Sequence, residues 1–152
     1  MENAIKFMKE AIKEAKKAEL IDEVPIGCVI VKDNKVISRG HNIRESKQNS
    51  IGHAEIIALT KAAKKLNDWR LEGCDMYVTL EPCIMCAGAI IQSRIKTVYF
   101  GAFDLKGGAF GSSINVLEAS NINHHPEIVS GVMKDDCSQL ITNYFKSKRN
   151  KK

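Results

Sequence analysis

The chain has 152 residues, of which 44% are hydrophobic and 27% are charged. This composition excludes a disordered or collagen-like chain, and the length suits a single globular domain over residues 1–152. No window approaches the roughly eighteen consecutive apolar residues of a membrane-spanning helix. The N-terminus carries charge every few residues and lacks the apolar core of a signal peptide.

The net charge of +5 comes from a basic C-terminal tail. Residues 146–152 contain five of the 23 basic residues and no acidic one, so the remaining 18 balance the 18 acidic residues. Such a tail is a common contact for nucleic-acid phosphates, and equally a solubilising chain end. The five cysteines are odd in number and suit a reducing compartment, so we expect a cytoplasmic protein without a disulfide framework.

The first half of the chain predicts a helix, a hairpin and a second helix. In residues 3–20 the apolar residues repeat at helical spacing and are expected to form the core-facing side of a helix: Ile5, Met8, Ile12, Ala15 and Ala18. Two β-rich runs at 26–32 and 35–40 are joined by the turn residues Asp33-Asn34 and predict a hairpin. After a polar loop, residues 53–66 have the propensity and the packed face of a helix.

The second half predicts strands that alternate with helices. The strands are expected at 74–80, 96–101 and 127–132, and the helices at 83–94 and 134–146. This alternation implies parallel pairing through right-handed crossovers, so we predict an α/β fold.

Several aromatic and histidine residues lie outside this pattern. Trp69 is expected to be a packing residue. Phe103 and Phe110 lie in a glycine-rich loop at 102–112. Their rings are either exposed, where they can stack on bases, or buried under the loop or in a subunit interface. The adjacent His124 and His125 are expected on the surface, where they could face RNA phosphates.

One pair of motifs carries metal chemistry. Cys83 and Cys86 are spaced C-x-x-C, which points both sulfurs the same way on the first turn of a helix, and His53 lies thirty positions upstream. Cys and His are the ligands that Zn²⁺ prefers, and three protein ligands leave a fourth position for water, as in catalytic sites. Glu55, two residues after His53, is placed to move protons. Both ligand-bearing helices are expected to begin at the same edge of the sheet.

Two other interpretations of the cysteine pair are weaker. A thioredoxin-like redox pair gives His53 and Glu55 no task, and Ile84-Met85 between the cysteines does not suit it. A structural zinc needs a fourth ligand, which would have to come from one of three unpaired cysteines: Cys28, Cys74 and Cys137.

The H-x-E…P-C-x-x-C arrangement is the signature of zinc deaminases. Over nearly its full length the chain closely resembles the bacterial tRNA-specific adenosine deaminases of the cytidine deaminase-like superfamily. The strongest matches are Glu23-Val24-Pro25-Ile26-Gly27, His53-Ala54-Glu55, Trp69-Arg70-Leu71, Tyr77-Val78-Thr79-Leu80-Glu81-Pro82-Cys83, Met85-Cys86-Ala87-Gly88, Ser93-Arg94-Ile95, Lys106-Gly107-Gly108 and Asn123-His124.

The resemblance implies hydrolytic deamination of adenosine to inosine at the wobble position of a tRNA anticodon. It implies one Zn²⁺ per subunit held by His53, Cys83 and Cys86, with Glu55 as the catalytic proton shuttle. It also implies a three-layer α/β/α fold around a central mixed five-stranded sheet. The implied partners are a tRNA anticodon stem-loop and a second copy of the chain, because the RNA site of similar enzymes uses both subunits.

The resemblance also assigns substrate-binding residues. Asn42 is expected to hydrogen-bond the flipped adenine, and the helix N-terminal amide of Ala54 is placed to orient it. Val24 and Leu80 are expected to form walls of the pocket. Asp104 and Lys106 are expected beside the anticodon backbone. The sequence departs from the family pattern at Gly52, Phe110 and His125, and the last two concern RNA contacts and not the chemistry.

Two competing functions remain open at this level. A zinc-dependent deaminase of a free nucleoside or nucleobase would use the same chemistry, but it would have no use for the basic tail. A catalytically silent binding module would keep the fold for dimerisation, and it would have no need of Glu55.

Overall fold

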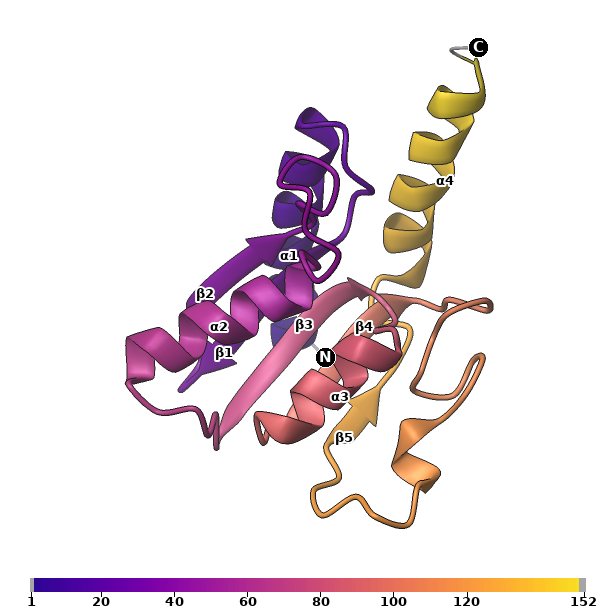
Figure 1. Ribbon diagram of the computed structural model, residues 1–152. Coiled ribbons are helices and arrows are strands. Elements are labelled where there is room, and N and C mark those ends of the chain that lie inside the picture. The colour runs from indigo at the N-terminus through magenta and orange to yellow at the C-terminus, as the bar shows by residue number, and fades with distance from the viewer. Residues whose placement is uncertain (1, 151–152) are drawn as a thin grey trace.

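The computed structural model describes residues 2–150, which form a five-stranded sheet between two layers of helices (Figure 1). The elements are α1 (Glu2–Leu20), β1 (Gly27–Lys32), β2 (Lys35–His41), α2 (Ala54–Leu66), β3 (Cys74–Leu80), α3 (Ile84–Gln92), β4 (Thr97–Ala102), a 3₁₀ turn η1 (Val116–Glu118), β5 (Glu127–Val129) and α4 (Lys134–Asn150). The predicted mixed five-stranded α/β/α fold is confirmed. Within residues 2–150, no helix has the combination of length and apolar character that crossing a bilayer requires.

The strands lie in the order β2-β1-β3-β4-β5. β1 is antiparallel to both of its neighbours, while β3, β4 and β5 run parallel. The chain from β2 through α2 to β3 therefore passes over β1, so these two parallel strands are not direct partners. The predicted hairpin turn is present. Asp33 and Asn34 both have positive φ, which is the conformation of a two-residue type I′ hairpin turn.

The sheet divides two apolar cores. Alternate residues of the central strands face α2 and α3, among them Ile30, Met76 and Phe100. The intervening residues face α1 and α4, and there Tyr77 stacks on Tyr99 with ring centroids 4.3 Å apart. Helices cover both faces of β3, which is why this strand is buried almost throughout.

Close backbone approach sets where the helices lie on the sheet. Ala54, Ala58 and Ala62 are the fully buried face of α2. A Cβ at Gly40 of β2 would overlap the carbonyl of Ala54, so glycine is required for α2 to dock at this height. Gly27 of β1 has the same relation to α1. The small residues therefore fix the position of the helix that carries His53 and Glu55.

Two packing predictions were wrong. Ile5 is 41% exposed, because the packed face of α1 is centred on residues small enough to approach Gly27, including Ala11, Ala15 and Ala18. Trp69 is 54% exposed and does not fill the core. Its ring instead lies against the guanidinium groups of Arg70 and Arg94, 4.4 and 5.7 Å from the ring centroid.

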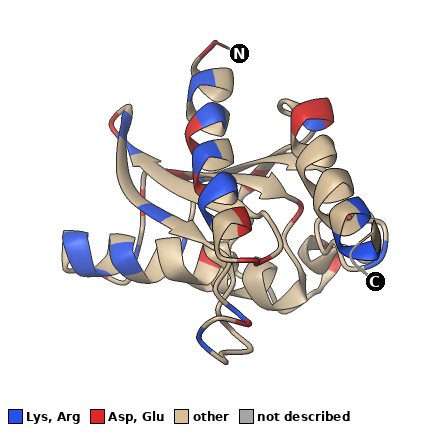
Figure 2. Cartoon of the chain, turned by 90° about the horizontal axis from the view of Figure 1, so that it is seen from above, with Lys and Arg blue, Asp and Glu red and all other residues tan. Residues whose placement is uncertain are grey.

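The C-terminal helix is longer than predicted. It continues from Lys134 to Asn150, so residues 146–150 of the predicted tail are helical, and residues 151–152 lie outside the described residues. Lys and Arg gather in its last turns and along the outer side of α1 (Figure 2). The last predicted strand is shorter than expected and ends at Val129.

Candidate metal and catalytic site

Three potential metal ligands meet at one edge of the sheet, where α2 and α3 begin (Figure 1). His53 is the N-cap residue of α2 and Cys83 that of α3, and neither side chain caps its own helix. Both are therefore free to face the space between the two helix starts. Cys86 follows in the first turn of α3 and is buried.

The spacing of these ligand atoms fits a tetrahedral metal. The Nδ1 atom of His53 lies 3.7 Å from the Cys83 Sγ and 3.5 Å from the Cys86 Sγ, and all three atoms lie within 4.8 Å of one another. Bonds of about 2.0 Å to nitrogen and 2.3 Å to sulfur at a tetrahedral angle place N and S about 3.5 Å apart. Among the described residues this group contains neither Cys28, Cys74 nor Cys137, so no fourth cysteine completes it.

The proton distribution within the cluster suits a metal site. A hydrogen bond from Cys86 lowers the pKa of Cys83 to about 3, and the same bond raises the pKa of Cys86. A hydrogen bond to Cys83 raises the pKa of His53. These opposite shifts favour the thiolate at Cys83 over that at Cys86, and binding of a metal ion would release a thiol proton.

Glu55 lies in the first turn of α2 beside these ligands. Its side chain is buried, and burial raises the pKa of Glu55 to about 7. Glu55, His53 and Cys83 line a cavity of about 100 Å³ together with Ile26 and Leu80. A carboxylate, the ligand cluster and an apolar wall thus share one small space.

A larger groove of about 330 Å³ continues from this cavity, and the two share Leu80 and Asp104. Val24, Leu80, Asp104 and Lys106 all line it, so four of the six predicted substrate-binding residues meet there. The far wall belongs to α4, through Ile141 and Phe145.

The other two predicted contacts, Asn42 and Ala54, are not among the residues that line the cavity. Asn42 is 6% exposed, and its Oδ1 has no hydrogen-bond partner within residues 2–150. The Asn42 backbone N–H donates to the carbonyl of Ile26, which itself lines the cavity. Ala54 is fully buried as the first residue of α2, so its amide is one of the free N–H groups of a helix start.

Sequence reasoning gave no role to Glu81, which anchors the glycine-rich loop. Its buried carboxylate accepts backbone hydrogen bonds from Asp104, Phe110 and Ser112, each of 3.1 Å, and a fourth from the Ser112 hydroxyl. Gly108 is required beside it, since a Cβ there would overlap the carboxylate. The sequence feature that could have revealed this role was a carboxylate at the end of an apolar strand, followed by a loop whose backbone N–H groups need partners.

Glu23 has the same role for the loop that precedes His53. It is buried and accepts hydrogen bonds from the backbone N–H groups of Glu45 and Ser46. Burial alone would raise the pKa of Glu23, but the bonds from Ser46 and Glu45 outweigh it and leave the pKa below its usual range. Two buried carboxylates therefore hold the two loops that flank the site.

The remaining predicted residues separate into buried and exposed positions. Phe110 tucks under its loop and is 8% exposed, whereas Phe103 is 42% exposed and contacts Phe100 edge-on. His124 bonds the carbonyl of Ile95 through Nε2, and His125 is exposed. Gly52 is buried in the turn before His53, with the carbonyl of Asn49 3.0 Å from where a Cβ would lie.

Comparison with known proteins places this site in a family. Residues 2–149 match the family model of the MafB19-like deaminases. The tRNA-specific adenosine deaminase of Bacillus subtilis (strain 168) is 53% identical over 146 residues, which cover 96% of this chain and 91% of the relative. The chain therefore belongs to the deaminase family, and within it to the tRNA-specific adenosine deaminases.

Solved structures agree with that assignment. One from a study of A-to-I editing by tRNA:A34 deaminases at the wobble position has a TM-score of 0.86 and 42% identity, covering 88% of this chain and 97% of its own. The guanine deaminase of Bacillus subtilis is more distant, with a TM-score of 0.62 and 29% identity over 76% of this chain and 84% of its own.

The role of Glu81 can be tested by Glu81→Gln. The amide nitrogen cannot accept the bonds that one carboxylate oxygen accepts, so buried N–H groups lose their partner. We expect the free energy of unfolding to fall by about 2–3 kcal/mol, and proteolysis within 103–112 to become faster. Glu118→Gln is the matched control, because Glu118 is exposed, and it should change stability by less than about 0.5 kcal/mol. Equal stability of the two variants would contradict the anchoring role.

Proposed function

We propose that the protein is a zinc-dependent hydrolase that converts adenosine to inosine at the wobble position of a tRNA anticodon. The observation that carries the proposal is the meeting of His53, Cys83 and Cys86 beside the buried Glu55, in a chain of the tRNA-specific adenosine deaminase family. That ligand set and that carboxylate are what hydrolytic deamination of a base requires.

In this proposal the three ligands hold one Zn²⁺ per subunit. A bound Zn²⁺ would lower the pKa of a water molecule to about 7 and so supply a nucleophile at neutral pH. His53 binds through Nδ1, because this is the ring nitrogen that faces both sulfurs. The open side of the cluster faces the cavity that Glu55 lines, so water and base would meet there.

Glu55 moves the protons of the reaction. It takes a proton from the attacking water and delivers it to the purine ring, and it then assists the departure of the amine. C6 gains an oxygen and loses its nitrogen, so one water is consumed and one ammonia is released. The apolar side chains of Ile26 and Leu80 line the same cavity and exclude other water.

In this proposal one hydrogen-bond acceptor and one hydrogen-bond donor of the protein hold the base. The Oδ1 of Asn42 has no hydrogen-bond partner in the described part of the chain, and such a buried acceptor is costly unless a ligand donates to it. The amide of Ala54 is a free donor at the helix start. Val24 and Leu80 wall the groove, and Lys106 stands exposed at its edge, where a phosphate can approach.

The groove favours RNA over a free base. A free nucleobase would need only the cavity of about 100 Å³, whereas the groove extends it toward Asp104 and Lys106 by about 330 Å³. Extruding the target base costs little in an anticodon loop, because the base is not paired there. The basic last turn of α4, which Figure 2 colours blue, follows soon after the groove residue Phe145 and adds phosphate attraction there. The five free cysteines suit a cytoplasmic enzyme.

A homodimer is part of the proposal. The hollow of about 360 Å³ between α2 and α3 is lined by Ile56, Leu59 and Ala89, and by the exposed Trp69. Ile84 on α3 is 63% exposed. A second copy of the chain is the occupant that the family resemblance implies, and this face carries the two helices whose starts form the metal site.

Metal content gives a first prediction for this site. The purified protein should carry about one zinc per chain, and Cys83→Ser should reduce the zinc to a small fraction of that, because a neutral hydroxyl replaces a thiolate ligand. Cys74→Ala, at a buried cysteine outside the cluster, is the control and should keep its zinc. Elemental analysis of the two variants decides the ligand set, and loss of zinc from Cys74→Ala would contradict it.

Glu55→Ala tests the mechanism. The variant should bind zinc and an anticodon stem-loop as the wild type does, but inosine formation should fall by at least about a hundredfold, the usual contribution of a general acid–base group. Glu72→Ala removes an exposed carboxylate and should leave turnover unchanged. A fully active Glu55→Ala protein would show that another group moves the protons.

Ile84→Glu tests the dimer. A buried charge in the middle of an apolar interface should convert the protein to a monomer, as measured by light scattering after gel filtration. Leu20→Glu is the matched control, since Leu20 is 86% exposed at the end of α1 and should leave the assembly unchanged. A wild-type protein that is itself monomeric would contradict this part of the proposal.

A further inference from the structure

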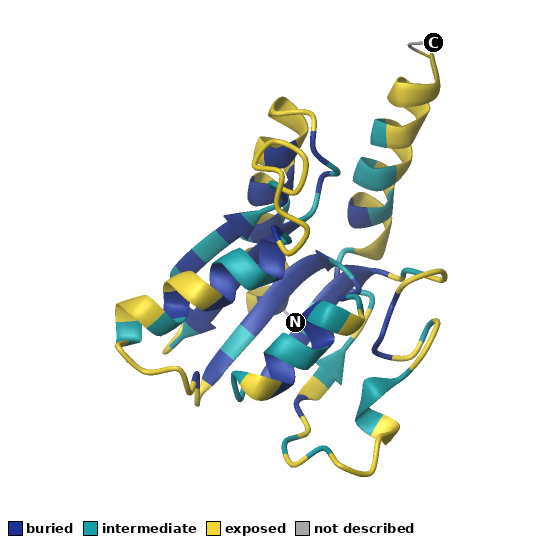
Figure 3. Ribbon diagram, in the orientation of Figure 1, coloured by how far each residue is buried: buried dark blue, intermediate teal, exposed yellow. Residues whose placement is uncertain are grey.

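Packing holds α4 to the sheet mainly at its base. Among its described residues, Cys137 in the first turn is the one that is buried. The Cys137 thiol lies against Gly101 of β4, and a side chain at position 101 would overlap the thiol. The next turns stand away from the sheet: Figure 1 shows them rising beyond its edge, and Figure 3 colours their residues as intermediate or exposed.

Hollows flank this helix on both sides. Two of them, of about 460 and 430 Å³, lie between α1 and α4, and the substrate groove of about 330 Å³ lies on the other side. The residues just before the helix, Gly131 and Met133, have φ values of 78° and 53°. Close packing therefore does not fix the distal half of α4, residues 141–150, and polar contacts have to do so.

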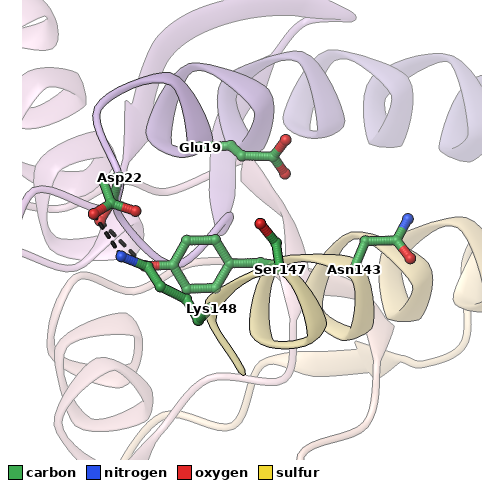
Figure 4. Close-up of a pocket in the computed structure, with 6 residues that line it drawn as sticks. Glu19, Asp22, Asn143, Ser147 and Lys148 are labelled. Carbon is green, nitrogen blue, oxygen red and sulfur yellow. Dashed lines mark hydrogen bonds and ion pairs between the residues drawn. The ribbon is translucent and has the colours of Figure 1, made fainter. Parts of the chain in front are cut away.

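Those polar contacts converge on Asp22, in the turn after α1. The hydroxyl of Tyr144 donates to the Asp22 backbone carbonyl over 3.1 Å, and the Lys148 amine forms an ion pair with the Asp22 carboxylate. Figure 4 shows the Lys148 amine against the Asp22 carboxylate, and both residues line the cavity between α1 and α4. The side chains of both ion-pair partners are well exposed, at 41% and 66%, so the ion pair alone holds weakly.

The same half-helix forms one wall of the substrate groove. Ile141 and Phe145 face Val24 and Leu80 across it, so a displacement of the distal half of α4 changes the width of the groove. Asp22 is also followed directly by Glu23, which holds the loop at 45–46. One short turn therefore connects the α4 wall to the loop that leads to His53.

We propose that Asp22 is a positioning residue, which holds the distal half of α4 through Tyr144 and Lys148 so that Ile141 and Phe145 complete the groove for the nucleotides beside the target base. This inference rests on the proposed function, because the groove is assigned to RNA. Asp22 touches neither the metal cluster nor Glu55, so it acts on substrate affinity and not on the chemical step.

The double variant Asp22→Asn/Tyr144→Phe removes the Tyr144 hydrogen bond and the charge that pairs with Lys148, while it keeps the size of both side chains. Asparagine tolerates the positive φ of 60° at position 22, and phenylalanine keeps the ring of Tyr144. Glu19→Gln is the matched control: it removes the same charge from a residue lining the same cavity, whose carboxylate makes no hydrogen bond or ion pair among residues 2–150. Amide hydrogen exchange in 141–150, and KM and kcat for an anticodon stem-loop, are measured for each protein.

In the double variant we expect exchange in 141–150 to become faster, KM to rise about three- to tenfold, and kcat to stay within about twofold of the wild type. Glu19→Gln should match the wild type in all three. An unchanged KM, an increased KM without faster exchange, or the same increase in Glu19→Gln would each overturn the proposal. If the wild type fails to deaminate the stem-loop at all, the proposed function fails instead, and the exchange data still show whether Asp22 holds the helix.

Discussion

The site depends on two helices that begin at the same edge of one sheet. His53 and Cys83 are N-cap residues of different helices, thirty positions apart, and they share an ion only if both helix starts lie at the same height. Parallel pairing of β3 and β4 directs the chain back over one face, and the close approach at Gly40 sets where α2 lies. A small residue in a strand distant from the chemistry thus positions a ligand.

Buried carboxylates perform the second task, which is to shape loops that lack a core of their own. Glu23 and Glu81 each accept backbone N–H bonds from a loop across the site, so each buried charge is compensated by several donors. The site is therefore bounded by two loops with fixed backbones on one side, and by a helix with little packing on the other. The groove for substrate lies where these two kinds of boundary meet.

Sequence patterns predicted the elements and the approach of the two sulfurs of Cys83 and Cys86, because both are local in their cause. Hydrophobic periodicity located the helices and strands, and the C-x-x-C spacing on a helix start brings two sulfurs together whatever the rest of the chain does. The errors concern packing against distant residues. Ile5 was expected in the core, but α1 packs through its alanines, because Gly27 lets their backbone approach closely. Trp69 is exposed and contacts two arginines. The role of Glu81 depends on a loop that begins 23 residues away, and the role of Asp22 depends on a helix residue 122 positions away, which no local pattern reveals.

The most direct test of the central claim is which substrates yield a deaminated product. Zinc-loaded protein is incubated with an adenine-containing anticodon stem-loop and, separately, with free adenosine, cytidine and guanine, and the products are identified by mass spectrometry. The groove and the ligand cluster together predict inosine in the stem-loop and no turnover of the free compounds. Turnover of a free nucleoside or base, with the stem-loop untouched, would keep the zinc chemistry and contradict the assignment to tRNA.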